Sequence, residues 1–169
     1  MAAVGPTDHF VFRHSPILRV YLLVLFPAFL ATIAIIVGMS SQNGSSWPWP
    51  SLVFFLGIFG WNAYWWLFRV ALRLDVSEGW LTWQTALRSG RDPIASVMEI
   101  RPLRGAGGCP AIVLAEGSKI PVLPGRGFRT FAEALGEQRP GIPIRLGLFA
   151  TIYDRLWFGS RFRREPESR

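Results

Sequence analysis

The amino-acid sequence predicts a membrane-spanning hairpin of two α-helices, followed by an α+β module of short antiparallel strands and one helix. No Asp, Glu, Lys or Arg occurs between Val20 and Phe68. After this run, the apolar residues first alternate with polar ones and later take helical spacing. Half of the residues are hydrophobic and the formal net charge is +7, so apolar and charged residues occupy different parts of the chain.

The charge-free run is long enough for two crossings of a bilayer. At about 1.5 Å per residue, the two apolar stretches form helices of about 34 and about 31 Å, against a hydrocarbon core of about 30 Å. A soluble domain of this size rarely lacks charges over such a length. We therefore expect a cytoplasmic N-terminal segment (1–16), a first transmembrane helix (17–39), an external loop (40–49), a second transmembrane helix (50–70), a cytoplasmic module (71–146), and an amphipathic helix with a basic tail (147–169).

The charged residues at the ends of the hairpin set its expected orientation. Arg13 and Arg19 precede or open the first span, and Arg69 and Arg73 close the second, while the connecting loop carries no charge. Arginine and lysine are enriched in cytoplasmic flanks. The sequence thus predicts a multi-pass protein of the plasma (inner) membrane, with both termini in the cytoplasm.

Asn62 is the one strongly polar side chain deep in the second span. Such residues form hydrogen bonds between helices in a membrane. Two interpretations are open: Asn62 contacts the first helix of its own hairpin, which we favour, or it contacts a helix of another protein.

The module begins where period-2 alternation begins. Leu72, Leu74 and Val76 alternate with polar residues, as in a half-buried strand. Turn signals at Glu78-Gly79, Ser89-Gly90 and Glu116-Gly117-Ser118 separate the strand-like segments. The strands are expected over 72–76, 80–85, 97–103, 111–115 and 120–123.

A single helix is expected to close the module. Phe128, Phe131, Ala132 and Leu135 form one apolar stripe at helical spacing, and Gly136 with Pro140 signals the helix end. Before it, Gly125-Arg126-Gly127 permits two interpretations. The segment is a capping turn, which we favour, or it binds an anion or a partner at the helix N-terminus through Arg126 and Arg129.

This order of a helical hairpin, short antiparallel strands and one closing helix resembles the bacterial pleckstrin-homology-like membrane proteins. The resemblance extends over about 72–146 and rests on loose turn and pattern signals at 74–82, 92–97, 114–120 and 128–135. It implies an antiparallel partial barrel or sandwich capped by one helix. The five or six strands expected in this module leave it one strand short of the family's full seven-stranded barrel. The resemblance also implies a scaffold for protein contacts or membrane association, without enzyme activity.

The C-terminal segment combines an apolar, aromatic cluster with arginines. Arg161, Arg163 and Arg164 follow this cluster and are candidate contacts for anionic lipid headgroups. Alternatively, the predicted helix packs on the module or on the hairpin. The cluster consists of Leu146, Leu148, Phe149, Ile152, Tyr153, Leu156, Trp157 and Phe158.

The sequence offers no recognisable catalytic or metal-binding motif. Cys109 is the sole cysteine, and the two histidines, His9 and His14, lie in the N-terminal segment, which we expect to be exposed and mobile. The glycine-rich stretch around Gly107 lacks the Gly-Lys-Ser/Thr of a phosphate-binding loop. We expect no metal, no cofactor, no small-molecule substrate and no nucleic-acid partner.

Two functional hypotheses follow. The first is a non-enzymatic, membrane-anchored scaffold or accessory protein, whose cytoplasmic module contacts partner proteins or the inner leaflet. The second is an accessory subunit of a larger membrane complex, such as a transporter or respiratory assembly, held mainly through the hairpin. Both hypotheses name membrane lipids and other membrane proteins as partners.

Overall fold

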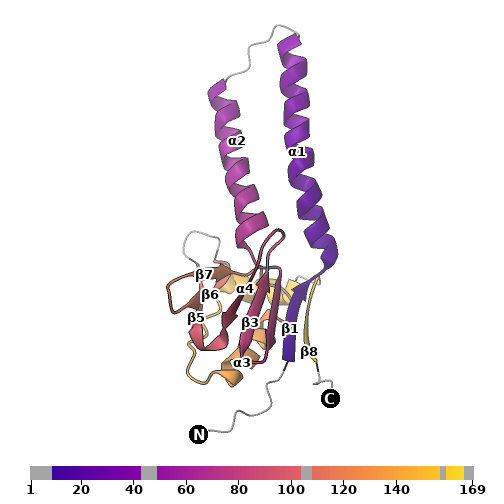
Figure 1. The fold of residues 1–169 in the computed structure, drawn as a ribbon. Coiled ribbons are helices and arrows are strands. Elements are labelled where there is room, and N and C mark those ends of the chain that lie inside the picture. The colour runs from indigo at the N-terminus through magenta and orange to yellow at the C-terminus, as the bar shows by residue number, and fades with distance from the viewer. Residues whose placement is uncertain (1–8, 43–48, 104–107, 157–158, 166–169) are drawn as a thin grey trace.

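The computed structural model describes residues 9–42, 49–103, 108–156 and 159–165. Two long helices stand out from a mixed body of strands and shorter helices (Figure 1). The first, α1, covers Pro16–Gln42, and the second, α2, covers Trp49–Tyr64 and continues as a π-helical turn over Trp65–Arg69. Both are long and apolar enough to cross a membrane. The expected helical stretches at 17–39 and 50–70 are therefore confirmed within a few residues.

In its described residues, the body contains two antiparallel sheets and two α-helices, so the expected α+β class is confirmed. The five-stranded sheet has the order β4-β3-β2-β1-β8, and the three-stranded sheet has the order β5-β6-β7. The bounds are β1 His9–His14, β2 Arg73–Ser77, β3 Trp80–Gln84, β4 Ser89–Pro93, β5 Val97–Pro102, β6 Pro110–Leu114, β7 Lys119–Pro121, β8 Ser160–Glu165, α3 Phe128–Gln138 and α4 Leu148–Leu156, with a 3-10 turn at Ile94–Ser96.

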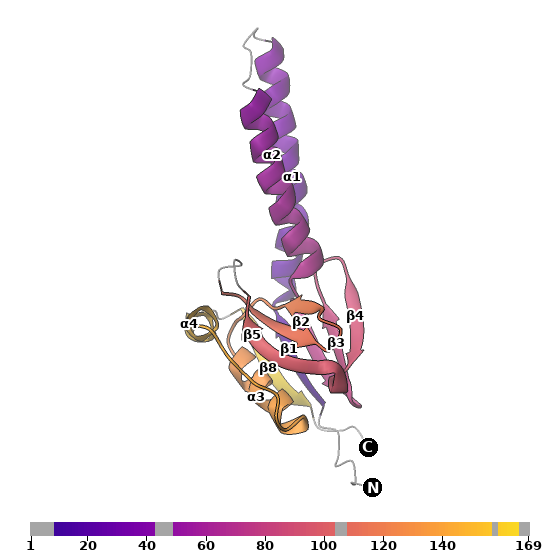
Figure 2. The same cartoon turned by 90° about the vertical axis from the view of Figure 1, so that its left-hand side faces the viewer.

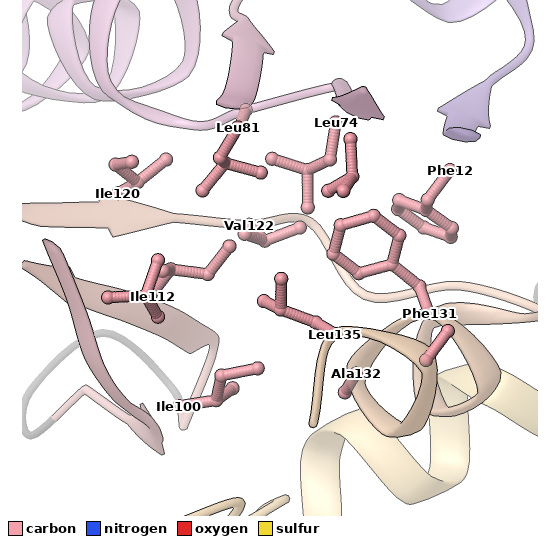
Figure 3. Packing of buried hydrophobic residues seen from close by; sticks show 14 of the residues in the cluster. Phe12, Leu74, Leu81, Ile100, Ile112, Ile120, Val122, Phe131, Ala132 and Leu135 are labelled. Carbon is pink, nitrogen blue, oxygen red and sulfur yellow. The ribbon is translucent and has the colours of Figure 1, made fainter. Parts of the chain in front are cut away.

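The hydrophobic core lies between the two sheets and α3 (Figures 2 and 3). The apolar stripe expected on α3 provides Phe131 and Leu135, both fully buried. Phe131 meets Phe10 of β1 edge to face, with the ring centroids 5.4 Å apart. Full burial of a side chain of this size contributes about 1.5–3 kcal/mol. The helix is therefore a part of the core and not a surface addition.

The N-terminal segment corrects one of our expectations. Residues 9–14 do not form an exposed tail but β1, which lies between β2 and β8 within the larger sheet. Phe10 and Phe12 have no exposed surface, and His14 is only 6% exposed. A strand of six residues with three aromatic or β-branched members suits a buried sheet position.

The C-terminal segment corrects a second expectation. After α4, the residues expected to form a basic tail form β8, which pairs with β1 from His9↔Glu165 to His14↔Ser160. The larger sheet thus extends beyond the expected boundaries 71–146 at both ends. One of its unexpected strands, β1, comes from the residues before the helical hairpin.

A third correction concerns Ser89-Gly90, which we interpreted as a turn. These residues begin β4, and Gly90 pairs with Trp83 of β3. A Cβ atom on Gly90 would lie 2.2 Å from the Trp83 ring. Glycine is therefore required here because the indole lies across the neighbouring strand, and the chain does not reverse at this point.

The end of α3 also differs from the expectation. The helix passes through Gly136 and ends at Gln138. A Cβ on Gly136 would lie 2.9 Å from Cδ1 of Ile144. This glycine lets the following segment approach the helix closely, and it is not a terminator.

Candidate functional site

The two apolar helices are attached to the body by a second hydrophobic cluster at their base. Leu22 and Phe26 of α1 are buried there with Leu72, Ala86 and Leu123 of the body. Trp65, Trp66 and Leu67 of the π-helical turn pack against the same cluster. The helices therefore share a packed interface with the end of the larger sheet.

Hydrogen bonds strengthen this attachment at the turn between β3 and β4. Nε of Arg19 on α1 donates to the carbonyl of Ala86 at 3.0 Å. The carbonyl of Leu67, at the base of α2, accepts from the Thr85 hydroxyl and from the Leu87 amide, both at 3.0 Å. One turn of the body thus holds the base of both helices.

Above the base, the helices enclose an apolar groove of about 310 Å³. They contact one another where Phe59 of α2 stacks on Phe29 of α1 at a centroid distance of 4.3 Å. Asn62 borders the groove, and its amide donates to the carbonyl of Ile58 at 2.9 Å. The hydrogen bond of Asn62 is thus formed within its own helix, and not with the first helix as we favoured. The groove is lined by Phe29, Ile33, Ile36, Val37, Leu52, Phe55, Ile58, Phe59 and Asn62.

The three candidate lipid-contacting arginines do not share one face of the sheet. Residues on β8 alternate between the two faces of the sheet, so Arg161 and Arg163 face away from α3. Arg164 lies on the α3 side, where its guanidinium donates to Glu137 at 2.9 Å. The sheet register instead places Arg161 beside Arg13, and Arg13 beside Arg73.

The N-terminus of α3 is occupied by a carboxylate of the chain itself. The amide of Gly127 donates to Oδ1 of Asp154, on α4, at 2.8 Å. The macrodipole of a helix favours a negative charge at this end. Arg129, the second candidate anion contact, pairs with Glu133 one turn along at 3.0 Å. The geometry therefore agrees with the capping interpretation of this segment, with Asp154 as the capping group, while Arg126 borders a separate hollow with Arg161.

The C-terminal helix α4 packs on the body through part of its surface. Ala150 is buried, and Asp154 reaches α3 as described. Leu148 and Ile152 remain 77% and 41% exposed. Of the expected apolar cluster, Trp157 and Phe158 lie outside the described residues.

His14 marks the junction between β1 and α1. Its Nε2–H donates to the carbonyl of Leu123 at 2.8 Å, while Nδ1 is buried without a hydrogen-bond partner. Burial lowers the pKa of His14 below its usual range, and the bond to the Leu123 carbonyl offsets only part of that effect. His14 is therefore a neutral, structural side chain.

The other reactive side chain singled out from the sequence is Cys109. Its thiol is half-buried, and burial raises its pKa above the ordinary value. A raised pKa disfavours the nucleophilic thiolate. Within the described ranges, no group of three or more His, Cys, Asp or Glu side chains is placed to hold a metal ion.

No family model, curated protein or solved structure matches the chain.

Sequence reasoning missed the side-by-side placement of Arg13, Arg73 and Arg161. The sequence identifies them only as flanking or tail charges, because their proximity depends on the pairing of three strands that are distant in the sequence. The run of strand-forming residues Phe10, Val11 and Phe12 was the available signal for β1.

Proposed function

We propose that the protein is a non-enzymatic, membrane-anchored scaffold. In this proposal α1 and α2 cross the inner membrane, and the sheet module lies on its cytoplasmic side and contacts partner proteins or the inner leaflet. The observation that carries the proposal is the exposure of two long apolar helices that are nevertheless firmly joined to a folded body.

The burial of the two helices argues against a soluble core. In the most apolar 18-residue stretch of each helix, only 11% of the residues of α1, and 6% of those of α2 with its π-helical turn, are buried inside the protein. Large side chains such as Ile35, Phe54 and Trp61 are 61–64% exposed. A contiguous apolar surface of this extent is unfavourable in water and suits the hydrocarbon core of a bilayer.

The placement of charge supports the orientation. Arg13, Arg69 and Arg73 all lie at the end of the helices that joins the body. The far ends of the described helices, at Gln42 and Trp49, carry no charge. The positive-inside rule then favours a cytoplasmic body.

The strand order supports the pleckstrin-homology-like interpretation of the module. Strands β1 to β4 lie in one sheet, β5 to β7 lie in the other, and α3 packs against both. These seven strands and one helix fit the architecture that the resemblance implies. The helical hairpin would then be inserted between the first two strands, and β8 would be an addition at the sheet edge.

Alkaline carbonate extraction tests the anchoring. The full chain is expected to stay in the membrane pellet at high pH. A matched control, in which residues 15–71 are replaced by Asn-Gly, keeps β1 and β2 paired but lacks both helices, and is expected in the supernatant. Release of the full chain by carbonate would contradict the proposal.

The groove between α1 and α2 favours a second candidate function, that of an accessory subunit held through the hairpin. A photo-crosslinking residue at Phe55, which lines the groove, is expected to capture a neighbouring membrane protein in that case. Phe54 is equally apolar and exposed but does not line the groove, so it is the matched control. Equal capture from both positions, or none, would exclude the groove as a specific subunit contact.

A further inference from the structure

Three arginines from three different strands form one row across the larger sheet. Arg73 of β2 pairs with Arg13 of β1, and Arg13 pairs with Arg161 of β8. Directly paired residues project from the same face, and neighbouring strands are about 4.8 Å apart. All three side chains are exposed. We call Arg13, Arg73 and Arg161 the arginine row.

Such a row is unfavourable unless an anion compensates it. Like charges placed directly opposite one another destabilise a sheet. Only Arg73 has a counter-charge among the described residues, the Asp75 carboxylate at 3.0 Å, and Asp75 also accepts from His9. Arg13 and Arg161 have no ion-pair or hydrogen-bond partner in the described part of the chain. The row therefore carries uncompensated positive charge.

The row lies at the end of the sheet from which the apolar helices rise. The helix α1 continues directly from the end of β1 (Figure 1). Arg13 precedes Pro16, the first residue of α1, by three positions. A polar headgroup layer about 5–7 Å deep covers the hydrocarbon core on each side. At the same end, the turn between β3 and β4 is bonded to Leu67 and presents Leu87, which is 50% exposed, and the exposed Arg88.

We propose that the arginine row binds the phosphate groups of anionic phospholipids in the inner leaflet. The inference rests on the proposed membrane anchoring, which places the arginine row at the depth of the lipid headgroups. A guanidinium group donates two parallel hydrogen bonds to a phosphate, and a row of three such groups matches the negative charge of several neighbouring headgroups. Bound lipid would supply the counter-charge that the sheet lacks and would hold this end of the sheet against the leaflet.

Lipid competition tests this site on the full chain. The protein, purified in a mild non-ionic detergent, is mixed with equimolar phosphatidylglycerol and phosphatidylcholine, and the bound lipids are measured by native mass spectrometry. Wild type is expected to retain phosphatidylglycerol preferentially. The triple variant Arg13→Gln, Arg73→Gln and Arg161→Gln is expected to lose that preference roughly tenfold or more.

A charge-matched control separates the row from general electrostatics. The exposed arginines Arg91, Arg129 and Arg145 lie outside the row, and their replacement by Gln removes the same charge. This control is expected to keep the wild-type preference. Equal losses in the two triple variants, or no preference in wild type, would overturn the proposal. If thermal melting shows that the triple variant of the arginine row does not fold, the single variant Arg161→Gln, on the edge strand, takes its place. It is expected to reduce the preference for phosphatidylglycerol about fivefold.

Two further measurements distinguish lipid phosphate from free phosphate and test the membrane anchoring separately. Inorganic phosphate at the lipid concentration is expected not to displace phosphatidylglycerol; displacement would assign the row to free phosphate instead. Carbonate extraction of the same wild-type chain reports on anchoring independently. A chain that stays in the membrane but shows no lipid preference would contradict the arginine row and leave the anchoring intact, whereas a chain that is extracted would contradict the anchoring itself.

Discussion

Phe12 lies directly opposite Leu74 in the larger sheet, although both long helices separate them in the chain. Both side chains are fully buried in the core. The chain thus leaves the body from one central strand and returns to the strand beside it. The bases of α1 and α2 are consequently held together by strand pairing as well as by the cluster around Phe26.

This pairing predicts that the hairpin can be removed without loss of the body. His14 donates its amide to the carbonyl of Leu72 at 2.9 Å, so replacing residues 15–71 with Asn-Gly closes a two-residue β-hairpin at that point. We expect a soluble protein with cooperative thermal unfolding. A fragment restricted to residues 72–143 is the contrasting case. It lacks both β1 and β8, and with β1 it loses the buried rings of Phe10 and Phe12. We therefore expect it to remain unfolded. A folded 72–143 fragment, as judged by circular dichroism, would contradict the assigned core.

The Trp83 indole gives a prediction for Gly90. Its Nε1–H donates to Asp92 at 2.7 Å, and its ring fills the space that a Cβ on Gly90 would occupy. We expect Gly90→Ala to displace the ring and to lower the free energy of unfolding by about 1–3 kcal/mol. Gly79→Ala is a comparison without a clash, since nothing lies within 4 Å of that position, but it is strained by a φ of +79°. An unchanged free energy of unfolding in Gly90→Ala would argue against the placement of the Trp83 ring over Gly90.

His14 gives a prediction for pH dependence. Its pKa is lowered in the folded protein, mainly by burial, so the unfolded chain binds the proton more readily. Below the ordinary histidine value of about 6.5, the unfolded state takes up more protons and stability falls with decreasing pH. The contribution is constant above that value. The variant His14→Gln, whose amide also reaches a carbonyl acceptor, is expected to show a smaller decrease in melting temperature below pH 6.5. Identical pH profiles for the two proteins would contradict the role of His14.

The local features of the fold were predictable from the sequence. The charge-free run predicts the two apolar helices. The alternation of apolar and polar residues on either side of Glu78-Gly79 predicts β2 and β3, and the apolar stripe predicts α3. The hairpin turn even shows positive φ at both Glu78 and Gly79, as a two-residue turn requires. Each of these signals depends on residues that are close in the chain.

The features that the sequence did not reveal depend on distant pairing. β1 is a short strand that gains its stability only between β2 and β8, and the residues next to it in the sequence belong to a helix. Asp154 caps α3 from the next helix, and no local pattern marks that contact. The arginine row arises from the same non-local register.

The most direct test of the membrane-anchored account is site-specific labelling from outside the cell membrane. In a Cys109→Ser background, Ser41→Cys places a thiol at the far end of α1, and Ser118→Cys places one at the exposed β6–β7 turn of the body. A membrane-impermeant maleimide should label position 41 in intact spheroplasts and position 118 only after permeabilisation. Labelling of position 118 in intact spheroplasts, or of both positions only after permeabilisation, would contradict the account.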